Sequence, residues 1–194
     1  MSRPAVVLLA LVLCSGCQTS PSLAVDPYRS DSVVREKLAA IGDVKLAMAE
    51  FDSVQDGWTT ADCRHGPISL PGSDSIADYI RQGLMIELET AGLYDAAAST
   101  VVSGNLTKMR LRFDGRIGHT AIGATWFFSL QLESSNGASL SVESASSYRT
   151  GWDPIDCSLV AASLMPAVQK LLREAVSHPG FASLAGGHAG ADVP

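Results

Sequence analysis

The fold is decided by the stretch "ATWFFSLQLESSNGASLSVESASSYRT", which runs from Ala124 to Thr150. Its first half alternates apolar and polar side chains with a period of two, which is typical of a half-buried strand. The apolar set is Trp126, Phe128, Leu130 and Leu132, against Thr125, Ser129, Gln131 and Glu133. Asn136-Gly137 then predicts a type I′ hairpin turn, because Asn-Gly tolerates the positive φ angles that this turn needs. The chain returns with Leu140 and Val142 facing inward, so two antiparallel strands with one buried face are expected.

The segments before this stretch extend the same sheet. "TVVSGNLTKMRLRF", from Thr100 to Phe113, alternates apolar and basic residues and predicts a third hairpin-linked strand. Between these strands, "DGRIGHTAIGA" from Asp114 to Ala124 predicts a glycine-rich hairpin loop. Earlier in the chain, "VKLAMAEFDSV" from Val44 to Val54 alternates as well and predicts a separate strand.

Two long helices are expected. From Ser73 to Tyr94 the apolar residues recur every four positions, Ser75 with Asp78 resembles a capping box, and Gly92 marks the end. This helix buries Ile76, Ile80, Leu84, Leu88 and Ala91, with Glu87 and Glu89 on the exposed side. The last helix precedes His178-Pro179, and Pro166 is expected to kink it or to start a second helix. Its apolar stripe is Leu164, Val168, Leu171, Leu172 and Ala175.

The order of these elements predicts an α+β fold. Three strands follow one another as hairpins, so they are antiparallel, and their one-sided alternation requires a cover on a single face. We therefore expect a two-layer sandwich, with an antiparallel sheet of about four strands and two long helices packed on one face, in the order β-α-β-β-β-α. A short helix from Val33 to Ile41 is expected to precede it. The single domain is predicted to span residues 33–181.

The N-terminus has the features of a targeting segment. Arg3 is followed by an apolar run of nine residues, Ala5 to Leu13, which is shorter than the roughly 20 that span a bilayer. Such a run fits the apolar region of a secretory signal. Ser15-Gly16-Cys17 resembles a bacterial lipobox, in which signal peptidase cuts before a cysteine that is then acylated. The resemblance implies a signal peptide at residues 1–16 and lipidation of Cys17. An ordinary signal peptide cut elsewhere, or a short membrane anchor, stays open.

Two further boundaries follow from composition. Residues 17–32 are polar and rich in turn-forming residues, so they predict a flexible tether between the lipid and the domain. Residues 182–194 are mostly small and predict a disordered tail. By its resemblance to lipoproteins that carry a residue other than Asp after the acylated cysteine, Gln18 implies an outer-membrane location, facing the periplasm.

After removal of the leader, Cys63 and Cys157 remain. Two cysteines in an oxidising compartment most simply form a disulfide, which would tie a long loop to the start of the last helix. The alternative is a reactive thiol at Cys157, because a helix N-terminus lowers the pKa of a thiol.

The composition excludes several classes of function. A formal net charge of −6 argues against DNA or RNA as a partner. None of the four histidines stands four residues from another, so no metal site is expected. The sequence has no nucleophile elbow and no phosphate-binding glycine loop after a strand. We therefore expect no catalytic residues, no cofactor and no enzymatic activity.

One group of residues could form a binding surface. Lys108, Arg110 and Arg112 alternate on one strand face, and Arg116 follows in the predicted loop. Phe127 is expected on that same open face, opposite Trp126 and Phe128. The pattern fits either the solvated outer face of a sheet or an aromatic-basic patch for lipid headgroups or an acidic envelope protein.

Several stretches together carry a family resemblance. They are the lipobox ending in Cys17, "VKLAMAEF", "IADYIRQGLMIELETAGLY", "VSGNLTKMRLRF", "LQLESSNG" and "LMPAVQKLLREAVSHPGF". Their combination resembles uncharacterised bacterial lipoproteins of the YajG-like kind, and its layout is similar to auxiliary lipoproteins of envelope transport systems. The resemblance implies a non-catalytic binding, assembly or transport-accessory role at the membrane. An envelope thiol-redox protein or other enzyme using Cys157, and a purely structural module of a larger complex, are the alternatives.

Overall fold

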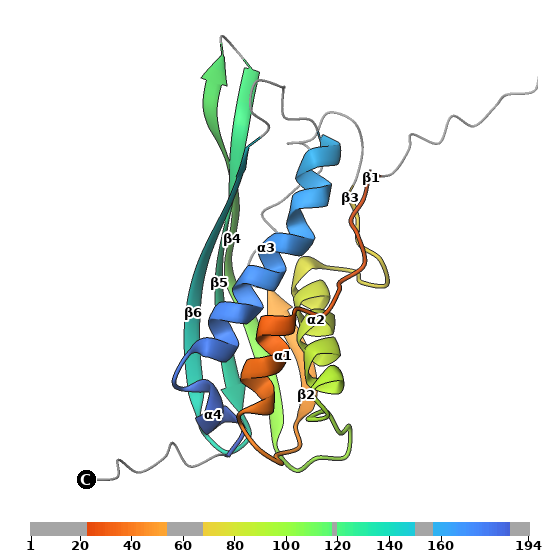
Figure 1. The fold of residues 1–194 in the computed structure, drawn as a ribbon, viewed down its shortest axis with the longest axis vertical. Helices are drawn as coiled ribbons and strands as arrows, with labels where there is room; N and C mark the ends of the chain where they lie inside the picture. The colour runs from red at the N-terminus through yellow and green to blue at the C-terminus, as the bar shows by residue number, and fades with distance from the viewer. Residues whose placement is uncertain (1–22, 54–67, 118–119, 150–156, 187–194) are drawn as a thin grey trace, which may run out of the picture.

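The computed structural model describes residues 23–53, 68–117, 120–149 and 157–186 (Figure 1). In chain order the elements are β1 (Leu23–Ala24), α1 (Ser32–Ala39), β2 (Ala47–Ser53), β3 (Ile68–Ser69), α2 (Ile76–Thr90), β4 (Val101–Ile117), β5 (Thr120–Ser134), β6 (Ser139–Arg149), α3 (Cys157–Ser177) and α4 (Phe181–Leu184). The expected order β-α-β-β-β-α is present as β2, α2, β4, β5, β6 and α3, and α1 is the expected additional helix.

The main sheet has the strand order β2-β4-β5-β6. The pairs β4–β5 and β5–β6 are antiparallel, as their hairpin connections require. β2 instead pairs with β4 in parallel, so the sheet is mixed rather than purely antiparallel. The reason is that α2 crosses over between β2 and β4, and a crossover connection of this kind returns the chain to the end of the sheet where it started.

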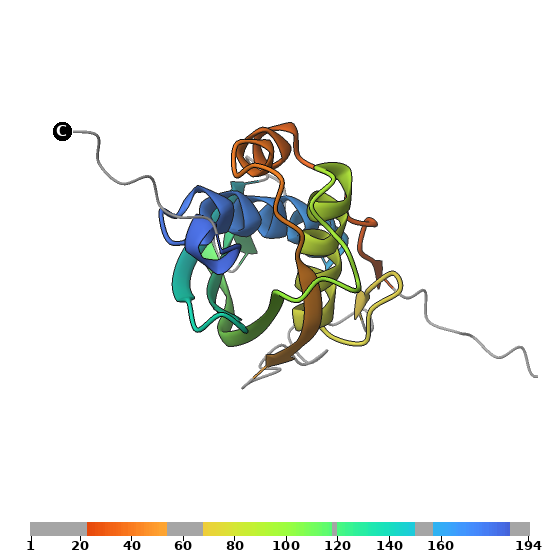
Figure 2. The ribbon, with the colours of Figure 1, turned by 90° about the horizontal axis from the view of Figure 1, so that it is seen from below.

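The helices lie together on one side of the sheet, which confirms the two-layer sandwich (Figure 2). The inward row of β5, from Trp126 to Leu132, is fully buried against them. The rings of Trp126 and Phe128 stack with their centroids 5.9 Å apart. The indole Nε1 of Trp126 donates a 2.8 Å hydrogen bond to Ser163 Oγ on α3, so the polar atom of this buried side chain has a partner.

Capping and breaking residues in the sequence correctly predicted both long helices. Ser75 caps α2 by accepting a hydrogen bond from Asp78 N, and Gly92 follows the helix with a φ of +73°. α3 is one continuous helix that contains Pro166, so the alternative of a second helix starting there is wrong. No helix within the described residues is long and apolar enough to cross a bilayer.

The predicted glycine-rich loop from Asp114 to Ala124 is wrong. β4 continues to Ile117 and β5 begins at Thr120, with Asp114 paired to Gly123. A Cβ at Gly123 would lie 3.0 Å from the backbone oxygen of Asp114. The glycine therefore allows a close approach between two paired strands, and the hairpin is much longer than its composition indicates.

The turn between β5 and β6 also differs in type from the prediction. Gly137 has a φ of +88°, but Asn136 does not have a positive φ, so the turn is not type I′. Gly137 N donates to Ser134 O, and Ser134 N donates to Ala138 O. These bonds fit a type I turn followed by a glycine in the left-handed region, which closes a hairpin equally well.

Residues 182–186 were predicted to belong to a disordered tail, and this is wrong for them. α4 buries Phe181 and Leu184, and Asn136 Nδ2 donates a 3.0 Å hydrogen bond to Ser183 O. The chain is therefore packed against the β5–β6 turn through Ala185, and residues 187–194 lie outside the described part.

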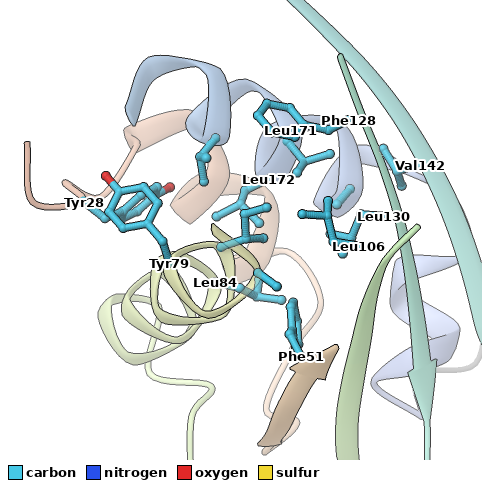
Figure 3. Packing of buried hydrophobic residues seen from close by; sticks show 14 of the residues in the cluster. Tyr28, Phe51, Tyr79, Leu84, Leu106, Phe128, Leu130, Val142, Leu171 and Leu172 are labelled. Carbon is cyan, nitrogen blue, oxygen red and sulfur yellow. The ribbon is translucent and has the colours of Figure 1, made fainter. Parts of the chain in front are cut away.

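A glycine in β4 makes room for an aromatic ring from the neighbouring strand. Gly104 pairs with Phe51 of β2, and a Cβ at Gly104 would lie 2.6 Å from the Phe51 ring. Figure 3 shows Phe51 beside Leu84 of α2, so the ring fills the space between the sheet and this helix. The parallel β2–β4 pair thus depends on the absence of a side chain at Gly104.

We predict that Gly104→Ala lowers the free energy of unfolding by about 1–3 kcal/mol, because the Phe51 ring has to move within a packed core. Ser103→Ala, on the opposite face of the same strand, is the control and should stay within about 0.5 kcal/mol. Urea denaturation measures both. A cost for Gly104→Ala no larger than that of the control would contradict the close approach of the ring.

Candidate functional site

The face of the sheet that points away from the helices is called the open face here. β4 contributes Lys108, Arg110 and Arg112 to it, and all three are exposed. β5 contributes Phe127, which is half-buried and lies directly opposite Arg110. The structure therefore brings four of the five predicted surface residues onto one face. For the fifth, Arg116, only the backbone is described, near the end of the hairpin opposite Ala121.

The cations of the open face are not equivalent. The guanidinium of Arg112 lies 5.2 Å from the centre of the Phe127 ring and its Nε lies 2.8 Å from Asp114 Oδ1. The hydroxyl of Thr125 also donates to Asp114, and this bond together with Arg112 holds the pKa of Asp114 below its usual value. The positive charge of Arg112 is therefore neutralised by Asp114, whereas Lys108 and Arg110 form no ion pair with another described residue.

A shallow hollow of about 340 Å³ lies beside these cations, between β4, β5 and β6. Its open-face lining consists of Lys108, Phe127, Ser129, Glu143 and Ala145. A cation, an aromatic ring, a hydroxyl and a carboxylate thus face the same space. This mixture suits a polar protein surface better than a bare phosphate, because Glu143 would repel a dense negative charge.

The predicted cysteine sites are only partly within the described residues. Cys17 and Cys63 lie outside them, so lipidation and the Cys63–Cys157 disulfide stay predictions. Cys157 is the first residue of α3 and is 7% exposed. Reactive cysteines are usually accessible, so the burial of Cys157 argues against the thiol-redox alternative.

Residues 23–31, named the strap here, differ most from the sequence prediction. They belong to the segment 17–32 that was expected to be a flexible tether. Instead, β1 pairs in parallel with β3, and Val25 and Tyr28 are buried in the core. The strap lies against α2 and α3, and the ring of Tyr28 packs edge-on to that of Tyr79, 6.4 Å between centroids (Figure 3).

α2 receives the strap along a stripe of Tyr79, Gly83 and Glu87, which are four residues apart and share one helix face. Tyr79 donates a 2.8 Å hydrogen bond to Asp26 O. A Cβ at Gly83 would come within 3.0 Å of the Tyr28 ring, so the glycine leaves space for it. Along the strap, Tyr79 thus donates a hydrogen bond to Asp26, Gly83 leaves space for the Tyr28 ring, and Glu87 supplies a carboxylate that accepts hydrogen bonds.

Glu87 is the centre of this arrangement, and its predicted place on the exposed side of α2 is wrong. Its side chain is 0% exposed. It accepts hydrogen bonds from Tyr28 Oη at 2.6 Å, Ser30 Oγ at 2.8 Å and Asp31 N at 2.7 Å. A buried carboxylate is tolerated only with such donors. Burial, together with the neighbouring Glu87 carboxylate, raises the pKa of Tyr28 far above its usual value, so Tyr28 remains a donor.

Asp31 connects the strap to α1 and α3. Its Oδ1 accepts a 2.8 Å hydrogen bond from Val33 N and so caps α1, while Oδ2 pairs with Arg173 of α3. Burial would raise the pKa of Asp31, but the bonds from Arg173 and Val33 outweigh it and hold the pKa below its usual value. Gln169 of α3 adds a 2.7 Å hydrogen bond to Arg29 O.

Sequence reasoning missed the strap although one signal was present. Tyr79, Gly83 and Glu87 recur every four residues beside the apolar stripe of α2. A glycine within a helix destabilises it, and such a residue usually has a packing reason. The identity of the segment that fills the gap could not be predicted from the sequence of the helix alone.

Within the described residues there is no group of three or more metal-ligating side chains.

Comparison with known proteins gives weak structural likenesses. No protein-family model matches the chain, and no curated protein matches it. A solved structure from Xanthomonas campestris, assigned to the domain family DUF330, superimposes with a TM-score of 0.47 at 14% identity, over 72% of this chain and 85% of that one. A candidate lipoprotein from Caulobacter crescentus superimposes with a TM-score of 0.41 at 15% identity, over 83% and 98%. At these values neither likeness establishes a shared function.

We predict that Glu87→Gln lowers the free energy of unfolding by about 1.5–3 kcal/mol, because one amide oxygen cannot replace two carboxylate oxygens for three donors. Glu89→Gln, two residues away on the exposed side of α2, is the matched control and should change stability by less than about 0.5 kcal/mol. Urea denaturation measures the difference. Hydrogen exchange should show faster exchange of the Asp31 amide in Glu87→Gln alone, and equal effects of the two variants would refute the role of Glu87.

Proposed function

We propose that this chain is a lipoprotein of the bacterial cell envelope, anchored in the outer membrane through Cys17 and facing the periplasm. In this proposal it acts without catalysis, and it binds another envelope component through the open face. The role is that of an accessory or assembly protein, held at the membrane surface to present a recognition surface.

The observation that carries this proposal is the docking of the strap. Cys17 and Leu23 are only six residues apart in sequence, and Leu23 is already paired with Ile68 in the small parallel sheet. Six extended residues span about 20 Å at most. An acyl chain on Cys17 would therefore hold the domain directly at the bilayer surface, rather than on the long flexible tether expected from composition.

The open face supports a binding role. Sheets in two-layer folds commonly leave one face to solvent, but here an aromatic ring and two unbalanced cations, Lys108 and Arg110, lie beside a hollow. Aromatic and cationic side chains in adjacent positions are typical of protein-binding surfaces. The neighbouring Glu143 favours an envelope protein over a lipid headgroup as the partner.

We expect Cys17→Ser to abolish incorporation of radiolabelled palmitate and to remove the protein from the outer-membrane fraction. Cys14→Ser is the matched control, because Cys14 lies within the predicted leader and should be dispensable for acylation. Labelling in intact cells followed by membrane fractionation measures both. Normal labelling of Cys17→Ser would exclude this cysteine as the anchor.

A photo-crosslinking residue at Arg110 or Gln131, both on the open face, should capture one defined envelope protein in living cells. The same residue at Glu36, exposed on α1, is the control and should not capture it. Lys108→Glu combined with a crosslinker at Gln131 should lower the yield, because it reverses a charge beside the hollow. Identical products from Gln131 and Glu36, or none from either open-face position, would rule out this face as the binding surface.

A further inference from the structure

The registers of β4, β5 and β6 arrange the residues of the open face in rows and columns. The first row is Lys108, Ser129 and Glu143, the second is Arg110, Phe127 and Ala145, and the third is Arg112, Thr125 and Ser147. These nine residues are named the three-row patch here. β5 forms its middle column, between β4 and the edge strand β6. Neighbouring columns lie about 4.8 Å apart and neighbouring rows about 6.7 Å apart.

The two outer columns of the three-row patch differ in charge and in size. The β4 column carries three cations with long side chains, whereas the β6 column carries Glu143 followed by Ala145 and Ser147. Lys108 and Glu143 share the first row, but about 10 Å of sheet separates their backbones. Neither forms an ion pair with another described residue. A complementary partner therefore presents an acidic group and small side chains to β4, and a cation to β6.

A second copy of this chain fits that description. When two open faces are stacked about a two-fold axis along β5, the β4 column of each copy lies over the β6 column of the other. Lys108 then lies over Glu143 of the second copy, and Phe127 lies over Phe127 of the second copy at the axis. The contact is isologous, so the pair of Lys108 with Glu143 forms twice.

The sizes of the side chains match in the same arrangement. Arg110 lies over Ala145 of the second copy, and Arg112 lies over Ser147. Two sheets that pack face to face are about 10 Å apart and interdigitate their side chains. A long side chain over a small one fits this spacing. The guanidinium of Arg110 is also one row from Glu143 of the second copy, so that carboxylate faces two cations.

Charge selects this direction of the two-fold axis. An axis across the strands through Phe127 would place Lys108 over Arg112, and Arg110 over Arg110 of the second copy. Like charges that face each other oppose association. The axis along β5 brings no cation of the three-row patch directly over another cation of the patch.

The axis along β5 also suits two copies in one membrane. Figure 1 shows β4, β5 and β6 along the long axis of the molecule, with β1 toward one end. A rotation about this direction leaves β1 of both copies at the same level. Lipids on Cys17 of both copies would therefore reach the same bilayer.

We propose that the occupant of the open face is a second copy of this chain, packed face to face about a two-fold axis along β5, with Lys108 of each copy paired to Glu143 of the other. This inference rests on the proposed binding role of the open face and on the proposed lipid anchor. It names the bound envelope component as a second molecule of the same protein.

The small size of the three-row patch determines where the dimer forms. Its backbone spans about 10 Å by 13 Å, whereas a stable interface buries about 800 Å² on each partner. Association of the protein in free solution is therefore weak. Anchoring of both copies in one bilayer raises their effective concentration and favours the dimer.

The first test uses the full acylated protein in intact cells and the thiol crosslinker bismaleimidoethane. Phe127→Cys places two thiols opposite each other at the axis, so it should give a covalent dimer of this chain. Glu36→Cys, exposed on α1, is the control and should give none, and the unsubstituted protein gives the background from the native cysteines. Absence of the dimer in Phe127→Cys would overturn the proposal.

Charge reversal identifies the partner as the same chain. In the Phe127→Cys protein, Lys108→Glu should lower the yield of dimer, and so should Glu143→Lys, because each creates facing like charges. The two reversals together in one chain should restore the yield, since each copy again presents opposite charges to the other. A double variant with a yield as low as that of the single variants would refute the pairing of Lys108 with Glu143.

Mixed crosslinking tests the axis without a change to the Phe127 ring. Chains with Lys108→Cys and differently tagged chains with Glu143→Cys should crosslink to each other when they are co-expressed. Each variant alone should give far less dimer, because identical positions of the two copies lie on opposite sides of the axis. A mixed product no more abundant than the products of the single variants would contradict the axis along β5.

Photo-crosslinking at Gln131 separates this inference from the proposed function. Adducts that contain only this chain support the dimer. Adducts with a different envelope protein, without any product between two copies, refute the second copy alone. No adduct of either kind refutes the open face as a binding surface and the dimer with it.

Discussion

A buried carboxylate, Glu87, holds the N-terminal segment of this fold on its helices. Glu87 has no contact with water, so its charge requires hydrogen-bond donors, and all three come from the strap, 56 to 59 residues earlier. Loss of the strap would remove all three of these donors from Glu87. The position of the strap in turn brings Asp31 to the start of α1 and to Arg173 on α3. One requirement of electrostatics thus connects the N-terminal segment to three helices.

This constraint has a consequence for function. A segment that composition assigns to a flexible tether becomes part of the domain, and only residues 17–22 remain between the proposed lipid and the packed chain. A long tether would let the domain sample many orientations, whereas a short link leaves few. The proposed role of the open face depends on this restriction, since it requires a defined orientation at the bilayer.

The two faces of the sheet have different roles: the inner face stabilises the fold, and the open face is the candidate binding surface. Its inner face, with Trp126 and Phe128 stacked against α3, supplies the core. On its open face, Phe127 comes from the same three-residue aromatic run but lies beside Arg112. Strand geometry forces this division, because successive side chains point to opposite faces. A core and a candidate binding surface therefore come from adjacent residues of one strand.

Local patterns in the sequence predicted much of this architecture. The alternation in β5 and β6, the apolar stripe of α2 and its cap at Ser75 depend only on neighbours a few residues away, so periodicity reveals them. The same is true of the placement of Lys108, Arg110 and Phe127 on one face. Composition gave a wrong prediction at Gly123, because glycine occurs both in loops and where two strands approach closely. Gly123 suggested a loop, but it permits close pairing of β4 and β5.

What the sequence determined by itself was which segments become strands and helices, and which face of each is apolar. The tertiary structure alone decided that Glu87 is buried, that residues 23–31 dock on α2 and that β2 joins β4 in parallel. The physical reason is the distance along the sequence over which each interaction acts. Periodicity reports on neighbours within a turn or two, whereas the burial of Glu87 depends on Tyr28, 59 residues away, and no local pattern encodes a partner at that distance.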